Sequence, residues 1–90
     1  MVYFIQAGDR GPIKIGYSKD PMKRMKVLQQ SNAKNLSLLG TIEGDKRKEW
    51  AIHNFLGFYK MKGEWFKSSE PILRFIYDLV FKSPWARPSY

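Results

Sequence analysis

The strongest constraint on the fold is a pair of β-prone segments joined by a short turn at the start of the chain. Residues 2–7 read Val-Tyr-Phe-Ile-Gln-Ala, and the first four have high β-sheet propensity. Residues 8–12 read Gly-Asp-Arg-Gly-Pro, a composition typical of turns. In residues 13–17 two isoleucines alternate with a lysine, which predicts a strand with one apolar face. We therefore expect a β-hairpin.

A helix and a third strand are predicted after the hairpin. Asp20 suits the N-cap of a helix, and Pro21 suits its first helical position. Apolar residues then recur at helical spacing, and we expect this helix to end near residues 31–32. Residues 36–42 predict the third strand, which a glycine closes soon afterwards.

Two further helices are predicted in the second half of the chain. Asp45 can cap a helix that we expect to continue to about residues 59–60, because apolar residues recur there with a period near 3.6. A short connector that can be extended follows at residues 64–67. A third helix, capped by one of two serines, is expected over residues 71–81.

The predicted order of elements is β-β-α-β-α-α, which indicates an α+β domain. We expect a small three-stranded antiparallel sheet flanked by about three helices. Ninety residues leave room for one domain, which we expect to occupy residues 1–82. Residues 83–90 contain two prolines and are expected to form a loose C-terminal tail.

The composition limits the metals that the chain can hold and the compartment we expect. It has no cysteine and one histidine, which excludes thiolate sites and multi-histidine zinc sites within one chain. A catalytic metal therefore needs oxygen ligands, which favours Mg²⁺ or Mn²⁺. No secretory leader and no apolar run of membrane-spanning length is visible. We expect a cytoplasmic protein without a membrane partner, located in a bacterium or, for a viral protein, in the host cell.

The charge balance predicts a polyanionic partner. Sixteen Lys and Arg residues stand against eight Asp and Glu residues, which gives a net charge of +8. A field of this sign attracts polyanions, and DNA is the partner that we expect. An anionic membrane surface or simple solubility is the alternative explanation. The basic residues are spread along the chain instead of forming one block, which argues against a polybasic membrane segment.

Short motifs occur in a fixed order on the predicted elements. From the N-terminus they are Met1-Val2-Tyr3, Lys14-Ile15-Gly16, Arg24 eight residues after that glycine, Glu49 with Ile52 and His53, and Gly63-Glu64-Trp65-Phe66. Over roughly residues 1–76 this ordered set resembles the GIY-YIG endonuclease superfamily, and more narrowly a short sub-branch with Lys-Ile-Gly in place of Tyr-Ile-Gly. The resemblance implies a nuclease fold with a three-stranded antiparallel sheet and flanking helices.

The chain departs from the superfamily pattern at three points. Lys14 stands where most members have a tyrosine, and Leu28 stands where they have a histidine one turn after the arginine. The late asparagine of the pattern is not evident. A lysine binds water or phosphate differently from a phenol, so these departures bear on catalysis more than on the fold.

The resemblance implies metal-dependent hydrolysis of phosphodiester bonds in DNA. Glu49 is expected to hold the metal, and Arg24 is expected to clamp the phosphate with its planar guanidinium. Tyr3 is expected to position the attacking water or take its proton, with a phenol acidified by nearby cations and by the metal. Lys14 is expected to lower that pKa and to contact the phosphate. Tyr17 is expected to supply a second hydroxyl near the site.

Further residues are expected to bind DNA or to support the metal ligand. The residues expected to contact nucleic acid are Lys14, Lys19, Lys23, Arg24, Lys46, Arg47 and Lys48. His53 and Glu64 are expected to support Glu49. A half-buried structural histidine is the alternative for His53, and a pair with a basic residue is the alternative for Glu64.

The expected function is therefore a DNA endonuclease with low intrinsic sequence specificity. We expect no second domain to read bases, and phosphate contacts alone carry little sequence information. A homodimer or a partner protein could supply the missing specificity. Two alternatives stay open on the same fold: a non-catalytic DNA-binding module, and a protein-interaction module whose basic face binds an acidic protein.

Overall fold

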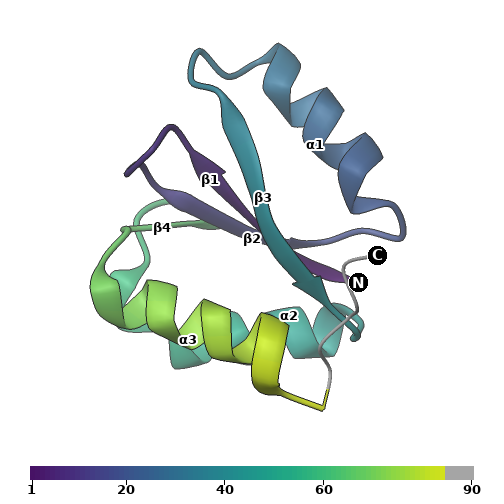
Figure 1. Ribbon diagram of the computed structural model, residues 1–90, viewed down its shortest axis with the longest axis vertical. Helices are drawn as coiled ribbons and strands as arrows, with labels where there is room; N and C mark the ends of the chain where they lie inside the picture. Colours follow the sequence, from purple (N-terminus) through teal and green to yellow (C-terminus); the bar gives the residue numbers. More distant parts are fainter. Residues whose placement is uncertain (85–90) are drawn as a thin grey trace.

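A hairpin of β1 (Val2–Ala7) and β2 (Ile13–Tyr17) forms the centre of the sheet in the computed structural model, which describes residues 1–84 (Figure 1). β3 (Leu36–Ile42) pairs with β1, and β4 (Trp65–Phe66) pairs with β2. The strand order is β3-β1-β2-β4, and all the pairings are antiparallel. The α+β fold and the bounds of the first three strands are as predicted.

The sheet has one strand more than the sequence predicted. Residues 64–67 were expected to form a connector, but Trp65 and Phe66 pair with Lys14 and Ile13. The side chain of Phe66 is fully buried, so its backbone groups need hydrogen-bond partners away from water. The edge of β2 supplies these partners, and the connector becomes a short edge strand.

α1 (Pro21–Gln30) begins as the sequence predicted. The carboxylate of Asp20 accepts a hydrogen bond from the backbone N–H of Lys23 at 3.1 Å, and Pro21 occupies the first turn. The helix contacts β1 and β3 and lies on one side of the sheet (Figure 1). Its first residue, Pro21, is its one fully buried residue.

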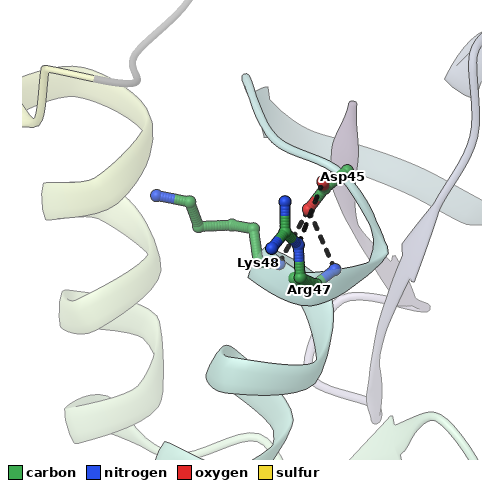
Figure 2. A network of polar contacts seen from close by, with 3 residues as sticks. All are labelled: Asp45, Arg47 and Lys48. Carbon is green, nitrogen blue, oxygen red and sulfur yellow. Dashed lines mark hydrogen bonds and ion pairs between the residues drawn. The ribbon is translucent and has the colours of Figure 1, made fainter.

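α2 (Lys46–Phe55) is capped by Asp45, as predicted. The Asp45 carboxylate accepts hydrogen bonds from the backbone N–H groups of Arg47 at 2.9 Å and Lys48 at 3.3 Å (Figure 2). The hydrogen bonds from Lys48 and Arg47 hold the pKa of Asp45 below its usual value. The cap therefore fixes the start of the helix that carries Glu49.

α2 ends at Phe55, earlier than the predicted end at residues 59–60. A short 3-10 helix, η1 (Gly57–Tyr59), follows instead. Gly57 lowers helix propensity at the point where the α-helix stops. The turn leads the chain back to the sheet, where Lys60 forms a bridge with Phe66. The prediction missed this end because the apolar periodicity continues through the turn.

α3 (Glu70–Lys82) is one residue longer at each end than the predicted helix over residues 71–81. It lies on the same side of the sheet as α2, opposite α1 (Figure 1). Within residues 1–84, no helix is both long enough and apolar enough to cross a membrane. Of the predicted tail, residues 83–84 follow α3, and residues 85–90 lie outside the described residues.

The two faces of the sheet bury very different amounts of apolar surface. The cluster between the sheet and α2 and α3 contains eleven buried residues: Val2, Phe4, Ile13, Ile15, Ile42, Ile52, Leu56, Phe66, Ile72, Ile76 and Val80. The cluster on the α1 side contains four: Tyr3, Ile5, Ala7 and Leu36. The α2 and α3 face is the main core of the domain. The α1 face leaves room for polar groups.

Candidate active site

The candidate site lies at the edge of β2 where β4 stops pairing. β4 pairs with Ile13 and Lys14, so the edge-facing backbone groups of Ile15 need other partners. The N–H of Ile15 donates to the carbonyl oxygen of Glu64 at 3.0 Å. The carbonyl oxygen of Ile15 lies 2.7 Å from Nε2 of His53. One residue of β2 thus anchors both α2 and the segment that carries Glu64.

His53 fixes α2 to this edge. A carbonyl oxygen can only accept a hydrogen bond, so Nε2 of His53 carries the hydrogen. The ring also meets Phe66 edge to face, with centroids 4.9 Å apart. These contacts fit the half-buried structural histidine that the sequence left open. Glu49 lies one turn earlier on the same helix, and the support that His53 is expected to give it stays a prediction.

The carboxyl groups of Glu49 and Glu64 meet in front of this edge. Burial raises the pKa of Glu49, and the nearby Glu64 carboxylate raises it further. A hydrogen bond from the protonated carboxyl of Glu49 to Glu64 also raises this pKa, whereas His53 and Lys46 lower it. Gly63 precedes Glu64 with a φ of +60°, a conformation that favours glycine. This turn brings Glu64 to the sheet edge.

Lys14 is bound to Glu64. Its ammonium Nζ lies 3.3 Å from Oε1 of Glu64 and 5.4 Å from the ring centroid of Trp65. Only 12% of the Lys14 side chain is exposed. The expected pair between Glu64 and a basic residue is therefore present. It places a positive charge beside the two carboxylates.

Tyr3 reaches the site across the face of Gly16, its partner on β2. A Cβ atom added to Gly16 would lie 2.3 Å from the Tyr3 hydroxyl oxygen, so only a glycine allows this approach. The hydroxyl interacts with the guanidinium of Arg24 and with the carboxylates of Glu64 and Glu49. Two strands and two helices thus bring their polar side chains to one place.

Burial opposes the acidification of the Tyr3 phenol that the sequence predicted from nearby cations and the metal. Its side chain is only 1% exposed, and this burial raises its pKa above the ordinary value. The hydrogen bond with Arg24 lowers the pKa, but the carboxylates of Glu64 and Glu49 raise it again. The prediction counted the nearby cations and missed both the burial and the nearby anions.

The donor set suits a hard divalent cation. Within residues 1–84, no group of three or more His, Cys, Asp or Glu side chains could hold a metal. Mg²⁺ needs only one or two protein carboxylates, because water and substrate oxygens complete its octahedron. Glu49 and Glu64 are two such carboxylates, and a bound cation would offset the repulsion from Glu64 that helps to raise the pKa of Glu49.

A pocket in front of the carboxylates offers space for a substrate. Its volume is about 530 Å³. Its lining residues are Lys46, Glu49, Trp50, His53, Asn54, Gly57, Lys60, Gly63 and Glu64. The pocket therefore combines acidic groups that suit a metal with lysines that suit phosphate.

The predicted DNA-binding residues fall into separate groups. Lys46 lines the pocket with Glu49, whereas Arg47 pairs with Asp45 at 3.6 Å and Lys48 extends toward α3 (Figure 2). Lys19, Lys23 and Arg24 line a second, shallower pocket of about 300 Å³. Their expected contacts with DNA stay predictions.

Tyr17 occupies the last position of β2, opposite Val2. Side chains alternate along a strand, so Tyr17 points to the face of Ile13 and Ile15, away from Tyr3. Tyr17 therefore lies on the other side of the sheet from the hydroxyl of Tyr3. Its catalytic role stays a prediction.

Five residues that line the pocket were not among the predicted site residues: Trp50, Asn54, Gly57, Lys60 and Gly63. Trp50 follows Glu49 directly and falls outside the apolar stripe of α2 that contains Ile52 and Leu56. A tryptophan off the apolar face of a helix is the sequence signal that could have indicated it.

The comparison with known families fits this arrangement. A family model described as the T5orf172 domain matches residues 1–80. The chain belongs to the T5orf172 domain family. T5orf172 domains occur in GIY-YIG-like, endonuclease-related proteins, which indicates a nuclease-like or DNA-binding module. No curated protein and no solved structure matches this T5orf172 domain significantly.

Proposed function

We propose that this T5orf172 domain is a metal-dependent endonuclease of the GIY-YIG type, from the sub-branch with Lys-Ile-Gly, and that it hydrolyses phosphodiester bonds in DNA. One observation carries the proposal: Tyr3, Arg24, Glu49 and Glu64 interact at one sheet edge although they are distant in the sequence. Lys14 lies beside them, paired with Glu64. Phosphodiester hydrolysis needs a positioned water, a clamp on the phosphate and a stabilised leaving oxygen.

Glu49 would hold Mg²⁺ or Mn²⁺, with Glu64 as the second carboxylate. When bound, such a cation supplies Lewis-acid stabilisation of the phosphoryl oxygens. Arg24 clamps the phosphate, and its guanidinium also orients the hydroxyl of Tyr3. Burial keeps Tyr3 protonated at neutral pH, so its hydroxyl is suited to orienting the attacking water. Lys14 and Lys46 balance the negative charge of the substrate.

We also propose low intrinsic sequence specificity. The residues that line the pocket offer phosphate and metal contacts, which carry little base information. A second copy of the chain or a partner protein would then supply specificity, in a cytoplasmic setting. A defined cleavage sequence for the isolated chain would contradict this part of the proposal.

The test is cleavage of plasmid and branched DNA by the purified protein in Mg²⁺ or Mn²⁺. We expect EDTA to abolish cleavage and Glu49→Gln to reduce it at least about 100-fold. Glu70→Gln is the matched control, because it removes an equal charge from an exposed position at the start of α3. Cleavage that survives Glu49→Gln would identify a contaminating nuclease and remove the assignment.

A non-catalytic DNA-binding module is the second candidate. The net charge of +8 favours it, because nonspecific DNA binding requires only phosphate contacts. The expected signature is salt-dependent binding without cleavage in either metal. Absence of DNA binding at low salt would instead favour a protein partner with an acidic surface.

A further inference from the structure

Trp50 is one of two exposed aromatic residues on α2, and the other, Phe55, stacks on Phe75. Trp50 is 70% exposed, whereas Ile52 on the same helix belongs to the main core. An indole contributes most to folding when it is buried, so at this position it adds little stability. An exposed indole is an available surface for stacking.

Trp50 lines the same pocket as the candidate metal ligands. It follows Glu49 directly in the sequence, and both residues border the pocket of about 530 Å³. Lys46 and Asn54 lie four residues before and after it, so they share its helix face. The side-chain amide of Asn54 donates to the backbone carbonyl of Trp50 at 2.9 Å, which holds the two residues together.

The charges around Trp50 fit a nucleotide better than an apolar partner. Lys46 and Lys60 line the pocket with the indole and suit the phosphates on either side of a base. Sites for single-stranded nucleic acid commonly combine such basic residues with aromatic platforms. The two carboxylates that line the same pocket would hold the cation that offsets the charge of the scissile phosphate.

We propose that Trp50 is a stacking platform for an unpaired nucleobase next to the scissile phosphate. This inference rests on the proposed function and narrows its substrate to DNA with unpaired nucleotides, such as flaps, bulges or single strands. In an intact duplex both faces of each base are covered by neighbouring bases. Only an unpaired or extruded base can offer a face to the indole.

The test measures affinity for four DNA probes by fluorescence anisotropy at fixed salt. The probes are a single strand, the same strand with one abasic site, a blunt duplex, and that duplex with an unpaired flap. All variants carry Glu49→Gln so that cleavage cannot distort the binding curves. A single-stranded RNA of the same sequence shows whether the sugar matters.

We expect Trp50→Leu to weaken binding of the single strand and the flap about tenfold and to leave duplex binding nearly unchanged. Trp50→Tyr should restore most of the loss, because a phenol also stacks. The matched control is Phe58→Leu, since Phe58 is 93% exposed and does not line the pocket. Thermal melting of each variant checks the fold.

The outcomes separate this inference from the nuclease proposal. Equal affinity of Trp50→Leu and its parent for every probe would overturn the stacking role, even if the protein with native Glu49 cleaves DNA. A Trp50-dependent preference for unpaired DNA in a protein that never cleaves would keep the stacking role and overturn the nuclease. Equal loss for duplex and single strand would also contradict stacking.

Discussion

The two faces of the sheet differ in what their side chains do. On the α2 and α3 face, apolar side chains from four strands and two helices form a closed core. On the α1 face, the smaller cluster includes Tyr3, and Lys14 and Arg24 occupy positions near it. One face stabilises the domain. The other face buries fewer apolar residues and carries polar groups near the edge of β2.

The difference between the two faces explains why Lys14 and Arg24 lie on the α1 side of the sheet. Burying a charge without a partner is costly, so a second full core on the α1 side would exclude Lys14 and Arg24. A thin cluster keeps their stems covered and their charged ends at the edge. The main core on the opposite face must then supply most of the free energy of unfolding.

The largest expected effect is a loss of stability from the main core. Ile76→Ala should lower the free energy of unfolding by about 2–5 kcal/mol, because it opens a cavity beneath α3. Urea unfolding followed by circular dichroism measures this change.

The matched substitution on the other face is Leu28→Ala. Leu28 is only partly buried against the small cluster, so we expect a loss of about 1 kcal/mol. Equal losses for Ile76→Ala and Leu28→Ala would break the contrast between the two faces.

An intermediate loss of stability is expected at Gly16, where the α1 face meets the candidate site. Gly16→Ala would place a methyl group 2.3 Å from the hydroxyl oxygen of Tyr3, and the ring must move. We expect a stability loss of about 1–3 kcal/mol and a larger proportional loss of DNA cleavage. Thermal melts and cleavage assays measure the two changes.

Gly57→Ala is the control for this prediction. A Cβ atom at Gly57 would meet no atom within 4 Å, so this variant should keep its stability. If Gly16→Ala is as stable as Gly57→Ala, then the ring of Tyr3 does not pack closely over residue 16.

The smallest effect is a gain of stability at the site itself. The pKa of Glu49 is raised in the folded protein above its ordinary value of 4.5, so ionised Glu49 disfavours folding at neutral pH. Glu49→Gln should therefore raise Tm by a few degrees at most at pH 7 without metal. The gain should fade as the pH drops below about 4, where the carboxyl is protonated in both states.

Thermal melting of both proteins across this pH range, in EDTA, provides the measurement. Glu70→Gln again serves as the charge-matched control. A Tm of Glu49→Gln that lies below that of the parent at pH 7 would mean that the carboxylate stabilises the fold, contrary to the burial and repulsion described.

The local features of the fold could be predicted from the sequence. The first three strands and the helix caps at Asp20 and Asp45 depend on neighbouring residues, and the structure confirms them. β4 could not be predicted in the same way. Its two residues form a strand only because β2, far away in the sequence, offers an unpaired edge.

The sequence identified several residues of the candidate site, but it did not predict the direction of their pKa shifts. The motifs identified Tyr3, Arg24 and Glu49, which do interact. The raised pKa of Tyr3 depends on burial between β1, β2 and α1, which no local pattern reports. Trp50 was missed because an aromatic residue is usually a core residue.

The hydrogen bonds of Ile15 also protect the domain from self-association. An unpaired strand edge is a template on which another chain can add a strand and begin to aggregate. Here the N–H of Ile15 donates to Glu64, and the carbonyl oxygen of Ile15 accepts from His53. A foreign strand would need these same two groups. Residues that assemble the candidate site therefore also block strand addition at this position of β2, whereas β3 forms the opposite edge of the sheet. A variant that releases these groups should be less soluble.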